Sequence, residues 1–95
     1  MPSTIIESVQ LALRTKSTAI VPEIGEYVAQ AQAELIRSGV SEDVVNASGE
    51  LVNGAIKMYC ISKMASDERQ RVKAEESWLY QQDCLRKTYR GVSDV

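Results

Sequence analysis

The sequence predicts an all-α protein: a small bundle of about four helices, with a central apolar third helix and a long C-terminal fourth helix. Apolar residues recur at helical spacing along the chain, and helix start and stop signals separate these stretches. Only five glycines and two prolines interrupt the 95 residues, of which 44% are hydrophobic. That hydrophobic content is enough for one folded domain. We expect the domain to span residues 1–90, followed by a flexible tail at residues 91–95.

The first helix is predicted to begin at Thr4 and to end near Arg14. Thr4 and Glu7 have the spacing of a capping box, in which each side chain satisfies a backbone N–H at the helix start. Three apolar residues follow at spacings that share one helical face: Ile6, Val9 and Leu13. We interpret Thr15–Val21 as a connecting loop.

The second helix has a clear signal at each end. Pro22 suits the first turn, where a missing N–H costs nothing, and the acids Glu23 and Glu26 favour the positive end of the helix dipole. Gly39 followed by Val40 predicts a Schellman ending. The predicted apolar stripe consists of Ile24, Val28, Ala31 and Leu35.

A polar stretch, Ser41–Ala47, predicts a turn, although Ser41 would also cap an early helix start. The third helix is predicted from about Ser48 to Met64. It is apolar on nearly every side and too short for a membrane, so it should lie at the centre of the bundle. Gly54 costs a helix about 1 kcal/mol, so we expect another helix to cross closely there. The apolar residues are Leu51, Val52, Ala55, Ile56, Met58, Tyr59, Cys60 and Ile61.

The fourth helix is predicted from about Asp67 to Tyr89. At a rise of 1.5 Å per residue it would be about 34 Å long, more than packing against three short helices requires, so we expect part of it to project. Asp67–Arg71 and Asp83–Lys87 have the spacing of helical ion pairs. The predicted apolar face consists of Val72, Trp78, Leu79, Leu85 and Tyr89.

The composition argues against catalysis. Histidine is absent, and the only cysteines, Cys60 and Cys84, lack a metal-ligand spacing, which excludes Cys/His zinc sites and the Ser/His/Asp and Cys/His catalytic arrangements. The pairs Glu42–Asp43 and Glu75–Glu76 are adjacent, so on a helix their side chains point about 100° apart and are expected to be solvated. We predict no enzymatic activity, no cofactor and no metal.

The location expected for this protein is intracellular. The polar residues Thr4 and Glu7 stand where a signal peptide would be apolar, and no apolar run is long enough to cross a membrane. Both cysteines are then expected to be reduced, semi-buried thiols.

Charge is unevenly distributed along the chain. The net charge is -2, yet residues 1–50 carry seven acids and three bases, and residues 51–95 carry six acids and eight bases. Either these are ordinary solvated helix faces, or opposite ends of neighbouring subunits attract one another. The basic run Arg69–Lys73 is likewise open to two interpretations, a charged helix face or a contact with DNA.

Two aromatic residues of the fourth helix are candidates for a protein interface. Trp78 and Tyr80 are of the type that dominates binding hot spots, but Trp78 is equally compatible with the core. Tyr27 and Tyr59 are expected at the edge of the core, with their hydroxyls reaching solvent.

The order of these patterns resembles the small head–tail connector (adaptor) proteins of long-tailed bacteriophages and prophages, which are often described as DNA-packaging proteins. The resemblance covers residues 5–90. It rests on the following segments: Val9-x-x-x-Leu13-Arg14, Gly39-Val40, Leu51-Val52-x-x-Ala55-Ile56-x-x-Tyr59 and Leu85-x-x-x-Tyr89-Arg90.

This resemblance implies a structural protein of virion assembly at the head–tail junction, present in the host cytoplasm during assembly. It implies a ring, commonly of about twelve or thirteen subunits, that joins the portal to stopper or tail-completion proteins and lets DNA pass without sequence-specific binding. The alternative is a small helical regulatory or adaptor module that binds one partner protein as a monomer or dimer. The expected interface residues are Trp78, Leu85, Arg86, Tyr89 and Arg90.

Overall fold

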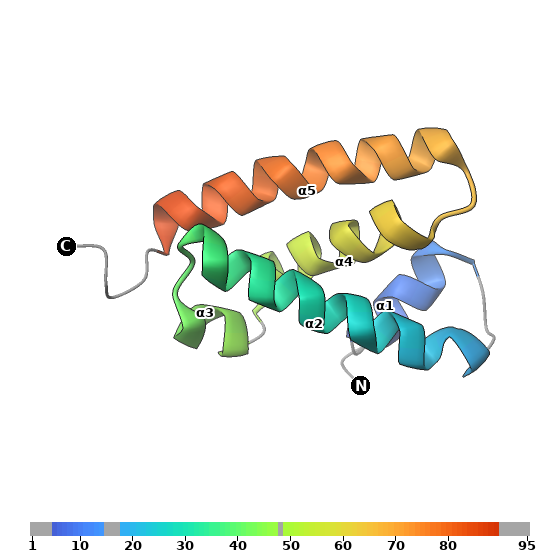
Figure 1. Cartoon of the computed structure of the whole chain (residues 1–95), viewed down its shortest axis with the longest axis horizontal. Helices are drawn as coiled ribbons and strands as arrows, with labels where there is room; N and C mark the ends of the chain where they lie inside the picture. The colour runs from blue at the N-terminus through green and yellow to red at the C-terminus, as the bar shows by residue number, and fades with distance from the viewer. Residues whose placement is uncertain (1–4, 15–17, 48, 90–95) are drawn as a thin grey trace.

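The computed structural model describes residues 5–14, 18–47 and 49–89. Within these ranges the chain forms five α-helices and one 3-10 turn and has no strand, which confirms the prediction of an all-α fold. The elements follow in the order α1 (Ile5–Ala12), η1 (Thr18–Ile20), α2 (Val21–Ser38), α3 (Glu42–Ala47), α4 (Glu50–Met64) and α5 (Glu68–Thr88) (Figure 1). Thr4 with its predicted capping box, Arg90 and the predicted tail lie outside the described residues.

Helix α4 is the central element, as predicted. Figure 1 shows it between α5 and α2, and it contacts α1, α2 and α5. It begins at Glu50, slightly later than expected, and ends at Met64. Leu51 in its first turn is 65% exposed, so the apolar surface of this helix is not buried on every side. Its buried residues are Val52, Ala55, Ile56, Cys60 and Ile61.

The predicted faces of α1 and α2 are confirmed by burial. Val9 of α1 is fully buried, with Ile6 and Leu13 half-buried against the same cluster, although α1 itself ends at Ala12. Apolar residues that recur at helical spacing form one stripe, and burying that stripe is what holds such short helices in the fold. On α2 the buried residues are Ile24, Ala31 and Leu35, with Val28 packed beside them.

The end of α2 has the predicted Schellman geometry. Gly39 takes a left-handed backbone conformation with φ of 114°. Its N–H donates to the Ile36 carbonyl at 3.1 Å, and the Val40 N–H donates to the Leu35 carbonyl at 3.0 Å. These two bonds satisfy carbonyls that the helix end leaves free. Val40 is buried, so the apolar contact expected of this motif is also present.

Two of the predicted connections are wrong in part. Residues 42–47, expected within a turn, form α3, in which the Val45 N–H donates to the Ser41 carbonyl at 3.1 Å and the Val45 side chain is fully buried. A helix this short depends on tertiary packing rather than on local propensity, so the polar sequence did not reveal it. The predicted loop Thr15–Val21 is shortened by η1 and by the start of α2 at Val21.

The turn between α4 and α5 is held by Arg71. Its Nη1 donates to the carbonyls of Ala65 at 2.8 Å and Ser66 at 3.2 Å. Asp67 caps α5 by accepting the Arg69 N–H at 3.3 Å. The predicted Asp67–Arg71 ion pair is therefore wrong, because the guanidinium binds the partly negative carbonyls at the end of α4 instead.

Gly54 does not mark a forced close approach. Helix α5 runs beside α4 there, but a Cβ on Gly54 would meet only the Gln81 side-chain oxygen, at 3.5 Å, which is ordinary contact. The expectation that another helix lies close to Gly54 is therefore confirmed, but the approach does not need a glycine, because a flexible side chain fills the space between the two backbones.

Candidate protein interface on the C-terminal helix

The inner face of α5 belongs to the core. Trp78 is 6% exposed, and its ring contacts the Tyr59 ring edge to face, with 4.9 Å between centroids and 69° between planes. Leu85 is also buried. Of the two interpretations of Trp78, the structure therefore supports the core. Neither side chain retains enough surface to anchor a partner against the folded chain.

Tyr59 joins this aromatic pair to α2. Its hydroxyl donates to Gln30 Oε1 at 3.2 Å, and the Lys63 ammonium lies 5.3 Å from its ring centroid. Burial, together with the nearby Glu34 carboxylate, raises the pKa of Tyr59. The half-buried ring with a hydroxyl at the surface agrees with the predicted place of this tyrosine at the edge of the core.

The C-terminal end of α5 is docked and does not project. The Ser41 N–H donates to the Tyr89 carbonyl at 2.7 Å, and the Arg86 Cγ lies 3.4 Å from where a Cβ of Gly39 would be. Near the opposite end, Ala74 of α5 is buried in a cluster against which the end of α1 packs. The expectation that part of this helix projects is therefore wrong, because both ends are used to connect the other helices.

Asp83 forms ion pairs with the basic residues near this end of α5. It pairs with Arg86, and its Oδ2 lies 3.0 Å from the Lys87 Nζ, which confirms the predicted Asp83–Lys87 pair. Hydrogen bonds from Arg86 and Lys87 hold the pKa of the Asp83 carboxyl below its usual range. The charge that Arg86 offers to a partner is reduced by this local pairing.

Apolar side chains are exposed along another face of α5. Val72 is 49% exposed and Leu79 is 54% exposed. The prediction that they extend the Trp78 face is wrong, because adjacent helical residues point about 100° apart and Leu79 follows Trp78 directly. Residues seven apart share a face, so Val72 and Leu79 define one of their own. Placing each residue of α5 at 100° from the one before it predicts this separate face from the sequence.

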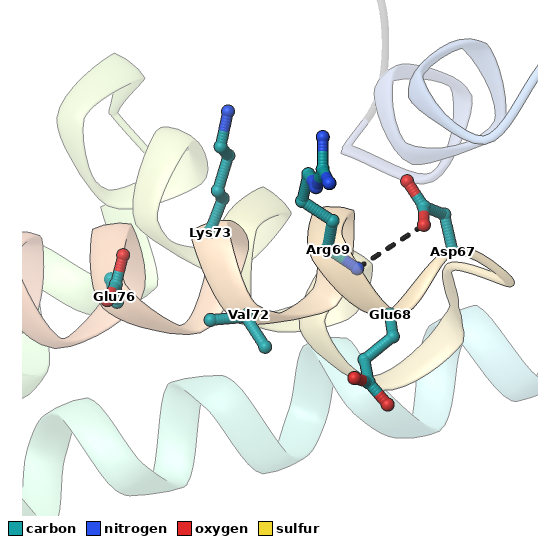
Figure 2. Close-up of a pocket in the computed structure, with 6 residues that line it drawn as sticks. All are labelled: Asp67, Glu68, Arg69, Val72, Lys73 and Glu76. Atoms are coloured by element: carbon teal, nitrogen blue, oxygen red, sulfur yellow. Dashed lines mark hydrogen bonds between the residues drawn. The ribbon is translucent and has the colours of Figure 1, made fainter.

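We call this face the outer stripe of α5: Val72, Glu76, Leu79 and Asp83. Its members are spaced at i, i+4, i+7 and i+11, so apolar and acidic side chains alternate along one line. In Figure 2, Val72 points away from the side on which Arg69 and Lys73 extend. Tyr80 lies outside the stripe and is 72% exposed, and its role at a protein interface stays a prediction.

The remaining candidates lie on the surface or are buried singly. Glu42–Asp43 and Glu75–Glu76 are exposed, as expected of solvated pairs. Cys60 is buried, which raises the pKa of its thiol to about 11, whereas Cys84 is exposed rather than semi-buried. Among the described residues, no three His, Cys, Asp or Glu side chains form a group able to hold a metal ion.

The fold and site define a small helical protein with an exposed amphipathic face. No helix in the described part of the chain is long and apolar enough to cross a membrane. No protein-family model, curated protein or solved structure matches this chain.

Proposed function

We propose that this chain is a structural assembly protein: a head–tail connector of a bacteriophage or prophage. In this proposal it forms a ring that joins the portal to stopper or tail-completion proteins and lets DNA pass. The observation that carries the assembly role is the outer stripe of α5, an exposed helix face whose apolar residues nothing within the described chain covers. The resemblance of the sequence to connector proteins supplies the particular assembly.

The outer stripe suits a contact between proteins. Val72 and Leu79 are each about half exposed, and covering them would remove apolar surface from water. Glu76, which lies between them, favours a partner surface with basic groups, whereas Asp83 is already paired with Arg86 and Lys87. The proposed interface therefore moves from the buried Trp78 and Leu85 to this stripe, with Arg86 at its rim.

A ring needs two different surfaces on each subunit, because every subunit meets its neighbours head to tail. The chain exposes large apolar side chains on helices other than α5. Leu11 of α1 is 74% exposed, and Leu51 lies open at the start of α4. These residues supply candidate second surfaces. The proposal assigns no catalytic or cofactor-binding role to any residue.

Native mass spectrometry and electron microscopy of the purified protein, alone and with a portal protein, test the proposal. We expect a closed ring with the portal, and we expect Leu79→Glu to prevent it while the isolated subunit stays folded. Gln70→Glu is the matched control, since it adds the same charge to α5 outside the stripe and should leave the ring intact. A chain that stays monomeric with portal present would overturn the proposal. A stable dimer that never forms a ring would favour the single-partner adaptor instead.

A further inference from the structure

We propose that the corner between the end of α1 and the start of α5 binds phosphate groups. An open pocket lies there, and its charged lining residues are Arg14 from the turn after α1, and Asp67, Arg69 and Lys73 from the start of α5. The site is contained within a single chain and requires no ring. A test of this site therefore does not depend on whether the chain has the proposed assembly role.

The cations of this pocket differ from most others in having no side-chain partner within the described part of the chain. Eleven lysines and arginines occur in the chain, and all except Lys16 and Arg90 lie in the described ranges. Five of these nine have a carboxylate, carbonyl or aromatic ring beside their charge: Arg37, Lys63, Arg71, Arg86 and Lys87. Four have no such partner for their side chains among the described residues: Arg14, Lys57, Arg69 and Lys73.

Three of the four unpartnered cations line this one pocket. In a chain that is otherwise acidic, with a net charge of -2, this local excess is not a consequence of composition. Counting Asp67 against the three cations, the pocket carries a net charge of +2. An anion with at least two negative charges would complete it.

The cations come from two elements that the fold brings together. Arg69 and Lys73 are one helical turn apart, and Figure 2 shows them extending from the same side of α5. Arg14 follows the end of α1 with φ of 57°, a left-handed conformation that is disfavoured for arginine. Its N–H donates to the Leu11 carbonyl at 3.1 Å, so the turn that holds Arg14 at the pocket is closed by the backbone.

A phosphate-rich ligand fits this lining better than a carboxylate does, because it brings several negative charges to a pocket with a net charge of +2, whereas a carboxylate brings one. Two guanidinium groups offer planar pairs of N–H donors, which match phosphate oxygens, and the lysine adds a point charge. The neighbouring pocket across Arg69 and Lys73 is lined by three acids, Asp67, Glu68 and Glu76, so anions are favoured only on the side of α1. Free polyphosphate and a nucleic-acid backbone share this group, and the experiment below separates them.

Titration of the whole protein with sodium tripolyphosphate, and separately with a short DNA duplex, tests the site. We expect saturable binding that weakens at least tenfold in the double variant Arg69→Gln/Lys73→Gln. The matched control is Arg37→Gln/Lys57→Gln, which also removes one arginine and one lysine charge but lies away from the pocket. An equal loss in the control pair would show that only net charge matters, and this would overturn the proposal.

Asp67→Asn provides a test in the opposite direction. Asparagine caps a helix as well as aspartate does, so the acceptor for the Arg69 N–H is retained while the one negative charge of the pocket is removed. We expect tripolyphosphate to bind several-fold more tightly to this variant. Unchanged or weaker binding, or no saturable binding of either probe to the parent protein, would contradict a phosphate site here.

The two probes then identify the source of the phosphate. Binding of the duplex that is tighter than that of tripolyphosphate, with log K falling against log salt at a slope of about -2.7 for three contacts, supports a nucleic-acid backbone. Binding of tripolyphosphate with no tighter binding of the duplex supports free polyphosphate. In either case, the largest changes in backbone amide NMR chemical shift during the titration should occur around Arg14, Arg69 and Lys73.

Discussion

The rings of Tyr59 and Trp78 meet edge to face at a centroid distance of 4.9 Å, and this contact joins the two helices of the α4–α5 hairpin at the core. The Tyr59 hydroxyl extends the connection to α2 through Gln30. The aromatic pair and this hydrogen bond therefore connect α2, α4 and α5. Such pairs contribute about 0.5–1.5 kcal/mol beyond the area that they bury.

Replacing Trp78 by alanine should lower the free energy of unfolding by about 3–5 kcal/mol, since it removes a buried ring and leaves a cavity. Leu79→Ala, at the next residue, should change it by no more than about 0.5 kcal/mol, because that side chain is half exposed. Urea unfolding followed by fluorescence for Leu79→Ala, and by circular dichroism for both variants, measures the difference. Similar losses in the two variants would contradict the assignment of these faces.

Gly39→Ala should destabilise the protein by about 1–2 kcal/mol, because alanine does not readily adopt a φ of 114°. Gly25→Ala is the control within the same helix. A Cβ there meets nothing within 4 Å, so alanine should stabilise α2 by about 0.5–1 kcal/mol. Thermal and urea unfolding should thus shift in opposite directions for the two substitutions, and a shift in the same direction would argue against the left-handed ending.

Loss of the Arg71 side chain should cost about 1–2 kcal/mol, since its guanidinium bonds to the carbonyls of Ala65 and Ser66 at the turn between α4 and α5. Arg37→Ala removes an arginine that pairs, among the described residues, with the surface carboxylate of Glu34, and it should cost about 0.5 kcal/mol or less. Urea unfolding of the two variants at low salt measures both losses of stability. Equal effects would mean that the turn does not depend on Arg71.

Cysteine labelling should separate the two thiols. In the folded protein a thiol reagent should modify Cys84 quickly and Cys60 only after unfolding, because Cys60 is buried. Mass spectrometry of the labelled chain, with and without denaturant, gives the two rates. Rapid modification of Cys60 under native conditions would show that the centre of α4 opens readily.

The same burial makes stability fall at high pH. Burial raises the pKa of the Cys60 thiol from 9.0 to about 11 in the folded chain, so the unfolded chain loses this proton first. This contribution to stability is fully present below about pH 9 and is lost progressively as the pH rises to about 11. Urea unfolding of Cys60→Ala should lack this part of the decline, whereas Cys84→Ala should keep it.

Much of the fold is determined by local signals in the sequence. Pro22 lies in the first turn of α2 and Gly39 ends that helix as predicted, and Asp67 caps α5, because these effects involve only atoms within one helical turn. The apolar stripes of α1 and α2 were equally clear. The central place of α4 also followed from its sequence, since a helix that is apolar on most sides must be covered on most sides.

Tertiary structure decided what local patterns leave open. Helix α3 exists because Val45 finds a place in the core, and Trp78 is buried because Tyr59 lies across from it. The outer stripe was assigned to the wrong face, since a list of apolar residues does not state the angle between them. Arg14 and Arg69 are far apart in the chain, and only the packing of α1 against the bundle gives them one pocket. Periodicity identifies the face that a helix must bury, whereas the fold alone determines which element covers it and which charges meet at its corners.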